Sequence, residues 1–424
     1  MREMRAGMLD LFERWSQIGG VARFQSPFFV SHLLTSPEAV QHVLQENHKN
    51  YSKEVRSSAI MRTALGDGLF LSDGEKWRAQ RRAAQPAFHR QRLAEMTSAM
   101  VDAVDSMLRR WSDFADSRGQ VDLLAESSRL TLDVIGRTLT SQDLLPYAEH
   151  TARAMAATFD YFNHSMNHLF SAPLFVPTAR NRAFKNALRE IHDLVGRIVE
   201  QRKRGTPKND LLSMMIEAYG TDSDAAELRD NIAIFLGAGT ETTAVALCWA
   251  WHLLSTHPDA HRKLREEVDT VLGSSRPTFE DLPKLTYTRM VVDEGMRLYP
   301  PAWVISRTAI GDDEICGFKI GAGTAVFMSP WVTHRSSLYW ESPTEFDPER
   351  FTKERSEERP DYAYYPFGGG PRMCIGDRFS IMEQTLALAM TAQKFAVHTE
   401  HDGTPDPVFS LRPKGGMRAT LARS

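Results

Sequence analysis

The sequence predicts a mainly α-helical protein with a small β-rich lobe, and two observations support this prediction. Over most of the chain, apolar residues recur with the spacing of amphipathic helices. Residues 306–328 instead alternate β-branched residues with glycine, as short hairpin strands do. The chain has no internal repeat and no Gly/Ser-rich linker, so we expect residues 1–424 to form one catalytic domain.

Helix boundaries follow from start and stop signals along the chain. His257-Pro258 and Pro300-Pro301 end two of the helical patterns, and Pro86 bounds or breaks the first. We predict a short strand over 28–34 and a weak hairpin at the C-terminus. The predicted helices cover 75–91, 123–139, 178–203, 210–219, 225–255, 259–272, 287–299 and 377–394.

Composition narrows the class of protein. The 424 residues carry a formal net charge of −3 and are 42% hydrophobic, which is typical of a soluble globular protein and does not indicate a nucleic-acid binder. The three cysteines, Cys248, Cys316 and Cys374, match no zinc or disulfide spacing. We therefore expect a cytoplasmic protein, with at most one chemically active thiol.

No transmembrane anchor is expected. The first twenty residues contain no long apolar run. Residues 232–254 are long and apolar enough to cross a bilayer, but Thr240, Glu241, Thr242 and Thr243 lie at the middle, where a charge is costly in lipid. A buried helix of a soluble protein explains the stretch better, and its polar centre then requires a functional reason.

The strongest motif is F-G-G-G-P-R-M-C-I-G, residues 367–376, in an irregular loop rich in proline and glycine. Glycines near Cys374 allow the backbone to turn tightly and approach a flat ligand, while Arg372 is placed to bind a carboxylate. A buried structural cysteine is the usual alternative. The pattern F-x-x-G-x-R-x-C-x-G should occur by chance on the order of once in ten thousand chains of this length. This motif makes Cys374 a candidate metal ligand.

A second pair, Glu294 and Arg297, shares one face of a predicted helix. Alone, E-x-x-R is weak, since most such pairs are solvated surface contacts. Arg350, in the segment F-D-P-E-R-F, could complete a triad with them. A buried triad would serve as a positional clamp rather than a source of stability.

The polar centre of the long helix is the third motif, residues 238–243 (A-G-T-E-T-T). Gly239 would leave room beside the helix for a diatomic ligand. Thr242 can bond back to the carbonyl four residues earlier and distort the helix, and Glu241 offers a proton route. A core helix with small residues for close packing is the favoured alternative when this stretch is taken alone. The residues that share one face are Phe235, Ala238, Gly239, Thr242 and Ala246.

Trp77 and Arg81 lie one helical turn apart, and both could reach an anionic ligand edge. Together, in this order and spacing, the motifs resemble those of the cytochrome P450 superfamily, the haem-thiolate monooxygenases, of soluble bacterial type. The resemblance covers nearly the whole chain, from Trp77 to the C-terminal hairpin. It implies a largely helical, roughly triangular domain in which haem b (iron protoporphyrin IX) lies between the long helix and the cysteine loop.

The resemblance also assigns roles residue by residue. It makes Cys374 the axial thiolate ligand of the iron, which favours O–O cleavage. It makes Glu241-Thr242 the acid–alcohol pair that handles protons during oxygen activation. The implied structural triad is Glu294, Arg297 and Arg350. The implied haem-binding residues are Trp77, Arg81, Ala238, Gly239, Arg307, Phe367, Gly370, Arg372 and Gly376, with Trp77, Arg81, Arg307 and Arg372 near the propionates.

Two departures from the family pattern stand out. The acid is Glu241 where many bacterial members carry Asp, and the Pro-rich lead-in before the first helix is missing. No flavin or ferredoxin domain follows Ser424, so the resemblance implies a monomer that receives electrons from a separate ferredoxin or flavodoxin with its reductase. Arg78, Arg82 and Arg90 belong to a basic run that would lie on the cysteine side of the haem and steer an acidic donor there. A solvated basic face is the alternative.

The substrate is the least determined part. The resemblance implies oxidation of a hydrophobic small molecule by O₂, and a terpenoid, fatty acid or macrolide of secondary metabolism would suit. Residues 159–175 are rich in Phe and Met, and we expect them to lie between two lid helices. The apolar pocket candidates are Phe235, Ala238, Trp303, Val304, Phe409 and residues 57–71.

Other functions stay open at this point. Some haem-thiolate proteins use peroxide, and others dehydrate or isomerise, although peroxide users generally lack the acid–alcohol pair. A haem-based sensor or carrier is a non-enzymatic alternative, but no output domain is visible. The simplest alternative is a helical protein whose cysteine is structural.

Overall fold

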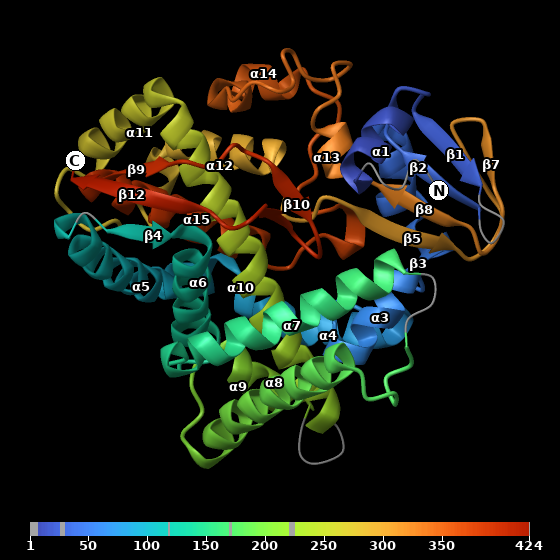
Figure 1. The fold of residues 1–424 in the computed structure, drawn as a ribbon, viewed down its shortest axis with the longest axis horizontal. Helices are drawn as coiled ribbons and strands as arrows, with labels where there is room; N and C mark the ends of the chain where they lie inside the picture. Colours follow the sequence, from blue (N-terminus) through green and yellow to red (C-terminus); the bar gives the residue numbers. More distant parts are fainter. Residues whose placement is uncertain (1–6, 26–29, 118, 169–171, 220–224, 424) are drawn as a thin grey trace.

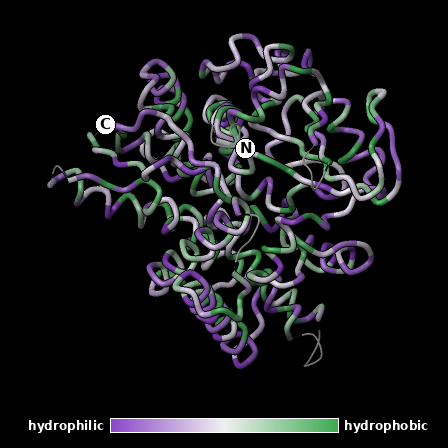
Figure 2. The backbone as a smooth tube through the Cα atoms, turned by 45° about the vertical axis from the view of Figure 1, so that its right-hand side comes forward, coloured by the Kyte–Doolittle hydropathy of each residue, from purple (hydrophilic) through white to green (hydrophobic). Residues whose placement is uncertain are grey.

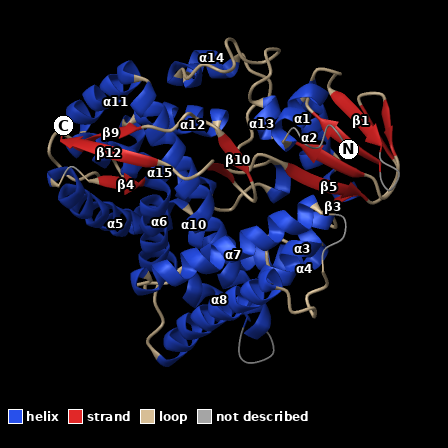
Figure 3. Cartoon of the chain, in the orientation of Figure 1, coloured by secondary structure: helices blue, strands red, loops and turns tan. Residues whose placement is uncertain are grey.

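Helices dominate the structure, a computed structural model that describes residues 7–25, 30–117, 119–168, 172–219 and 225–423. The outline is roughly triangular, with a β-rich lobe beside the N-terminus and a second group of strands near the C-terminus (Figure 1). Figure 3 separates the two strand regions, which lie on either side of the central helices. The predicted fold class, mainly α with a small β-rich lobe, is confirmed.

The N-terminal half is built from helices joined by short turns. Asp122 caps α6 by accepting hydrogen bonds from the amides of Leu124 and Ala125, and Thr178 caps α8 in the same way through Asn181. The helices are α1 (Met8–Ser16), α2 (Pro37–Gln41), α3 (Arg56–Leu65), α4 (Gly74–Ala84), α5 (Arg90–Asp116), α6 (Leu123–Leu139), α7 (Ala148–Asn167), α8 (Ala179–Arg204) and α9 (Leu211–Tyr219).

The C-terminal half centres on α10 (Ala225–Thr256), which runs through the middle of the molecule and packs along α6 (Figure 1). Of the most apolar window of α10, 78% is buried by the surrounding protein, as expected for a core helix. The other helices are α11 (Pro258–Val271), α12 (Thr286–Leu298), α13 (Pro330–Thr333), α14 (Lys353–Glu357) and α15 (Asp377–Lys394).

Within the described residues, the strands form four small sheets. The largest has the order β1-β2-β8-β5-β3 and forms the β-rich lobe; β2 and β8 are parallel, and the other neighbours are antiparallel. Strand β12 pairs with β4 and β9, β10 with β11, and β6 with β7. The bounds are β1 (Val21–Gln25), β2 (Val30–Leu34), β3 (Tyr51–Ser52), β4 (Gln120–Asp122), β5 (Ile305–Ala309), β6 (Asp313–Ile315), β7 (Phe318–Ile320), β8 (Ala325–Met328), β9 (Phe395–Thr399), β10 (Pro405–Pro407), β11 (Leu411–Pro413) and β12 (Arg418–Arg423).

The main hydrophobic core lies where α5, α6, α10, α12 and α15 pack together, and a separate cluster fills the β-rich lobe. Figure 2 shows hydrophobic segments gathered in the interior and hydrophilic ones along the outer helices. Trp111, Trp249 and Trp251 are among the largest fully buried side chains and lie in the main core. This core fixes α10 in place and therefore fixes everything attached to its polar centre.

Two sequence predictions need correction. Residues 159–175 do not simply lie between lid helices, because 159–167 belong to α7 itself; residues 169–171 of that segment lie outside the described part of the chain. The predicted helix 75–91 ends earlier: α4 stops at Ala84, and a 3₁₀ turn over Gln85–Phe88 contains Pro86. Of the predicted strand 28–34, residues 28 and 29 also lie outside the described residues.

Candidate active site

The cysteine loop, residues 367–376, turns tightly before α15. The Cys374 amide donates to the Phe367 carbonyl at 3.0 Å, and the Met373 amide to the Gly370 carbonyl at 3.1 Å. Gly370 has a φ of +61°, and any Cβ there would overlap the backbone carbonyl of Leu44. The loop therefore needs glycine at position 370 both for its conformation and for its contact with the segment before β3.

Cys374 is a free thiol at the N-terminal end of α15. Its side chain is accessible, yet desolvation by the surrounding protein raises the pKa of the thiol, against the opposing effect of the Gly376 amide. A thiol that is both accessible and enclosed faces space inside the protein. Among the described residues, no group of three or more His, Cys, Asp or Glu gathers as a metal site. Any metal at Cys374 must therefore bring most of its ligands with it.

A cluster of cations lies near Cys374, with Lys53 close enough to interact with the thiol electrostatically. Burial and the nearby Arg372 lower the pKa of Arg307 to about 10, and burial with Arg307 and Arg372 lowers that of Lys53 well below its usual value. Asp73 pairs with Arg372, but the Nη1 atom of Arg372 is buried without a partner. The Arg372 guanidinium also lies 4.2 Å from the centre of the Trp77 ring. The cluster thus has more positive charge than its own acid can neutralise.

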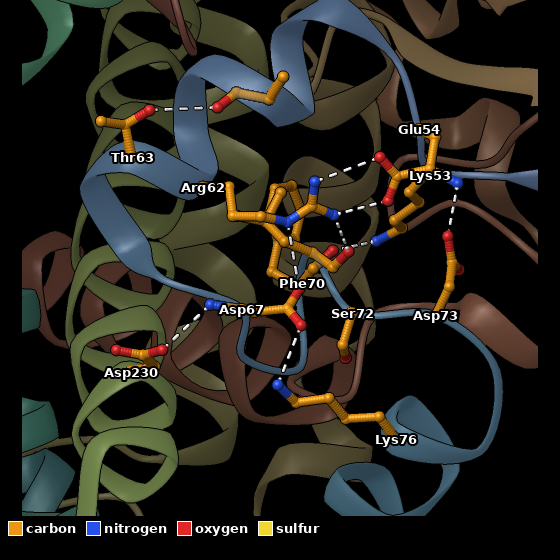
Figure 4. Close-up of polar contacts among 12 residues, drawn as sticks. Lys53, Glu54, Arg62, Thr63, Asp67, Phe70, Ser72, Asp73, Lys76 and Asp230 are labelled. Carbon is orange, nitrogen blue, oxygen red and sulfur yellow. Dashed lines mark hydrogen bonds and ion pairs between the residues drawn. The ribbon is translucent and has the colours of Figure 1, made fainter.

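Lys53 is a residue that the sequence analysis missed. Its Nζ donates to the Phe70 carbonyl at 2.6 Å, and its amide donates to Asp73 at 2.8 Å (Figure 4). The Cys374 thiolate raises the pKa of Lys53, so the two groups act on each other electrostatically. No local pattern marks Lys53, because it follows a two-residue strand and reaches the site only through folding.

Arg81, the remaining predicted cation, joins α4 to the cysteine loop. Its Nη1 donates to the Met373 carbonyl at 2.9 Å, and burial lowers its pKa while Cys374 opposes that effect. Arg78, Arg82 and Arg90 in the same region are all exposed. Arg78 pairs with Glu75, and Arg90 lies over the Phe279 ring.

Glu294, Arg297 and Arg350 come together as ion pairs behind the cysteine loop. Arg297 Nε and Nη2 donate to the Glu294 carboxylate at 2.6 and 2.7 Å, and Arg350 Nε lies 3.4 Å from Glu294 Oε1. The side chains of Glu294 and Arg297 are fully buried. Arg297 also donates to the carbonyls of His334, Pro343 and Glu345, so the group ties α12 to the segment that leads to the cysteine loop.

The polar centre of α10 is open on one side. Ala238 is exposed and Thr242 half-buried, whereas Thr240, Glu241 and Thr243 are buried. Thr242 Oγ1 donates to the Ala238 carbonyl at 2.8 Å, the back-bond that the spacing predicts. The prediction that Gly239 leaves room for a diatomic ligand needs correction. A Cβ at Gly239 would overlap Ile135 Cδ1, so the missing side chain makes room for α6 instead.

Glu241 and Thr242 are neighbours in sequence but have different partners. The carboxylate of Glu241 is bound by Arg412 Nε and Nη2, each at 2.6 Å, and by the Ser410 hydroxyl. Arg412 lies in β11 and Ser410 directly precedes that strand, and neither was predicted from the sequence. They form no motif with Glu241, since 168 or more residues separate them along the chain.

The remaining pocket candidates have different surroundings. Phe235 stacks on Phe88 at 6.0 Å between ring centres, and Phe409 stacks on Phe159 of α7 at 5.2 Å. Trp303 packs on Phe12 in the core cluster beneath α1, which argues against a pocket role. Val304 is half-buried beside the same cluster, and residues 57–71 form most of α3 and the loop after it.

Comparison with known proteins agrees with this geometry. A sequence model of the family described as cytochrome P450 matches residues 6–420. The chain belongs to the cytochrome P450 family. It is 35% identical to cyclooctatin synthase of Streptomyces melanosporofaciens, an alignment that covers 92% of this chain and 84% of the relative. With pentalenene oxygenase of Streptomyces avermitilis it shares 33% identity over 88% and 83% of the two chains.

A plant protein is also similar to this chain. Protein LUTEIN DEFICIENT 5, chloroplastic, of Arabidopsis thaliana is 32% identical over 92% of this chain and 69% of the plant protein. Another relative, also from Streptomyces melanosporofaciens, is named cyclooctat-9-en-7-ol 5-monooxygenase and is 33% identical. The predicted family and enzyme class, a cytochrome P450 monooxygenase, are therefore confirmed, and membership implies a haem-thiolate centre.

The residues present fit such a group. Haem brings four nitrogen ligands and two carboxylates, so it needs one protein ligand on the iron and cations for the carboxylates. Cys374 is the accessible thiol, while Lys53, Arg307 and Arg372 supply excess positive charge that includes an unpartnered buried N–H group. Ala238 and Thr242 leave the middle of α10 open.

Proposed function

We propose that this cytochrome P450 binds haem b through the Cys374 thiolate and inserts one oxygen atom from O₂ into a hydrophobic small molecule, with electrons from a separate donor. The observation that carries the proposal is the accessible, enclosed thiol beside a cation cluster with unneutralised charge. When bound, haem with its thiolate ligand supplies the oxygen-activating chemistry.

The chain's own residues bind, orient and deliver protons. Lys53, Arg81, Arg307 and Arg372, with Trp77, would hold the two propionates, and the glycines of the loop would let its backbone approach the ring. Phe367, Gly370 and Gly376 shape that loop. The Thr242 hydroxyl would act as a hydrogen-bond and proton donor on the open side of α10. Glu241 would relay protons to that hydroxyl.

The substrate class rests on the relatives and on the apolar lining. The names pentalenene oxygenase and cyclooctat-9-en-7-ol 5-monooxygenase denote oxidation of unsaturated hydrocarbon skeletons. Phe159, Phe162 and Phe409 give this chain an aromatic contact between α7 and the C-terminal hairpin. We therefore propose a terpenoid-like guest, in secondary metabolism, ahead of a fatty acid or polyketide.

A ligand screen followed by turnover tests this proposal. Terpenes, fatty acids and polyketides are titrated into the haem-loaded protein, and binding is recorded as a spin-state shift in the absorption spectrum. We expect terpene hydrocarbons to give the largest shifts and a product one oxygen atom heavier, labelled by ¹⁸O₂. Product that carries no label, or that forms from peroxide as fast as from O₂ and electrons, would favour a peroxide-using enzyme instead.

Thr242→Ala tests the proposed role of the acid–alcohol pair. Without the hydroxyl, we expect electrons to be lost as hydrogen peroxide, with product per electron pair lower by about tenfold or more. Thr243→Ala is the control, since Thr243 is buried and bonds to Ser380 instead of facing the open side. Unchanged coupling in Thr242→Ala would refute the role.

The electron donor is proposed to be an acidic ferredoxin or flavodoxin that docks at Arg78, Arg82 and Arg90, in a cytoplasmic monomer. Their exposure makes them available to a partner. Arg82→Glu with Arg90→Glu should slow the first electron transfer about tenfold at low salt and much less at high salt. Arg109→Glu on α5, also exposed, is a control for net charge. Equal rates and equal salt dependence in all variants would exclude this surface.

A further inference from the structure

The β10–β11 hairpin contacts two helices at once, and Arg412 of this hairpin contacts both of them. On one side Arg412 binds the Glu241 carboxylate of α10 with two hydrogen bonds of 2.6 Å. On the other side its guanidinium carbon lies 4.8 Å from the centre of the Phe159 ring of α7. The direction of the Glu241 carboxylate is therefore linked, through Arg412, to the position of α7.

Aromatic contacts fix the hairpin against α7. Phe409, which precedes β11, stacks on Phe159 with an interplanar angle of 13°, and Phe162 meets Phe409 edge-on at 5.9 Å between centres. Phe162 has no cation–ring contact with Arg412 among the described interactions, whereas Phe159 has one. The two phenylalanines thus share the hairpin contact but differ in their contact with the ion pair.

Phe159 also keeps water from the pair. The Glu241 side chain is 3% exposed and that of Arg412 27%, so water reaches the pair mainly from the arginine side. The ring of Phe159, itself buried, lies over that guanidinium. Because an ion pair weakens steeply as the surrounding dielectric rises, displacement of α7 would loosen the hold on Glu241.

We propose that Arg412 is a positioning residue that holds Glu241 ionised and turned to the hairpin, and that α7 controls this hold through Phe159. Thr242 stays on the open side of α10 and bonds to Ala238 meanwhile. Glu241 then serves the proton relay only when α7 moves and Arg412 releases the Glu241 carboxylate. This inference rests on the proposed relay role of Glu241.

Infrared spectroscopy of the haem-loaded protein at pH 7 tests the hold directly. In Arg412→Met, a buried carboxylate without its cation takes up a proton, so we expect a new protonated-carboxyl C=O band. The band should vanish in Arg412→Met/Glu241→Gln and be absent in Arg412→Lys, which keeps the charge. Glu383, whose pKa burial raises well above its usual value, gives its own band, and subtraction of matched Glu241→Gln spectra removes it. No Glu241 band in Arg412→Met would overturn the proposal.

Proton delivery without substrate tests the control by α7. NADH oxidation is measured with a surrogate ferredoxin and reductase and no added substrate, in H₂O and D₂O. We expect Arg412→Met to raise the rate about fivefold and Phe159→Leu to raise it in the same direction, whereas Phe162→Leu, which leaves the Phe159 ring over Arg412, should have a clearly smaller effect. Equal effects of the two phenylalanine variants would overturn the link to α7.

The Glu241→Gln background separates the two levels of failure. If Glu241→Gln changes neither the rate nor its isotope effect, the proposed relay fails, while the infrared result still decides whether Arg412 holds Glu241. If Glu241→Gln lowers the rate and Arg412→Met leaves it unchanged, the relay stands and the control by Arg412 is refuted.

Discussion

Two buried Glu–Arg pairs lie in different parts of this cytochrome P450, and they differ in what surrounds them. Glu294 and Arg297, behind the cysteine loop, are fully buried, and Arg297 also binds three backbone carbonyls. Glu241 and Arg412, beside the open centre of α10, have one partly exposed member that is covered by a ring of α7.

The difference shows that a glutamate–arginine pair can serve either as a structural clamp or as a contact that can be released. Arg297 binds Glu294 within α12 and three carbonyls of the segment that leads to the cysteine loop, so the contacts of this pair join two parts of the protein. Around Arg412, the cover is the Phe159 ring of a different helix, and removing that ring exposes the guanidinium further. We therefore expect substitutions at the first pair to cost stability and those at the second to change behaviour more than stability.

The largest effect is expected for Glu294→Gln, which leaves two buried arginines without their acid. The free energy of unfolding should fall by about 3–5 kcal/mol, with loss of bound haem. Glu349→Gln breaks the exposed 2.7 Å pair with Lys263 and should cost less than about 1 kcal/mol. Urea unfolding of both variants measures the difference, and equal costs would remove the distinction drawn for Glu294.

The next largest effect is the pH dependence of the free energy of unfolding that arises from His252 on α10. Burial, with His401 and His257 nearby, lowers the pKa of His252 from 6.5 to about 4. Between these values the unfolded chain binds a proton and the folded one does not, so stability is lost as pH falls from 6.5 towards 4. The loss for one proton is up to about 1.4 kcal/mol per pH unit.

His252→Asn isolates this contribution, since other titrating groups are common to both proteins. Unfolding free energies at pH 7.5 and pH 5 should differ less in the variant than in the wild type. Identical pH dependence would mean that His252 binds its proton as readily in the folded protein as in the unfolded chain.

Arg412→Met should cost only about 1–2 kcal/mol, because Glu241 can accept a proton and keep its bond to Ser410. This cost lies well below the cost expected for Glu294→Gln. The difference between the two free energies measures how differently the two Glu–Arg pairs contribute to stability. A cost for Arg412→Met as large as that for Glu294→Gln would make both pairs structural clamps.

The smallest effects come from two glycines of α10. Gly237 has open space where a Cβ would lie, so Gly237→Ala should stabilise the helix by about 0.5–1 kcal/mol. At Gly239 a Cβ would overlap Ile135, so Gly239→Ala should cancel that gain or cost about 1 kcal/mol, with recovery in Gly239→Ala/Ile135→Val. Equal stabilisation by both alanines would show that α6 does not need Gly239.

Much of the fold could be predicted because helix signals are local. The bounds of α6, α8, α10 and α15 follow from caps, apolar spacing and stop residues that lie within the helices or next to them. Helix α5 was not predicted, although its buried residues, among them Leu93, Met96 and Met100, recur at helical spacing. Part of α7 was missed because its Phe-rich C-terminal end was interpreted as a segment between two lid helices.

The site was predictable where its residues share a motif. Cys374, Arg372 and Gly370 lie within five positions of one another, and Glu294 and Arg297 lie on one helical turn. Lys53 and Arg412 reach the site from segments with no motif, and only the folded chain brings them to Cys374 and Glu241. Gly239 carried a misleading signal, since small residues in a helix serve close packing as often as ligand access.

The ferrous–CO difference spectrum of the haem-loaded protein tests the central claim, the thiolate bond of Cys374, most directly. The wild type should give the red-shifted Soret band that a thiolate ligand produces, and Cys374→Ser should bind haem and lack that band. Cys316→Ser, which alters an exposed cysteine away from the loop, should keep it. A fully haem-loaded wild type without the red-shifted band, or a Cys374→Ser variant that retains it, would contradict the assignment.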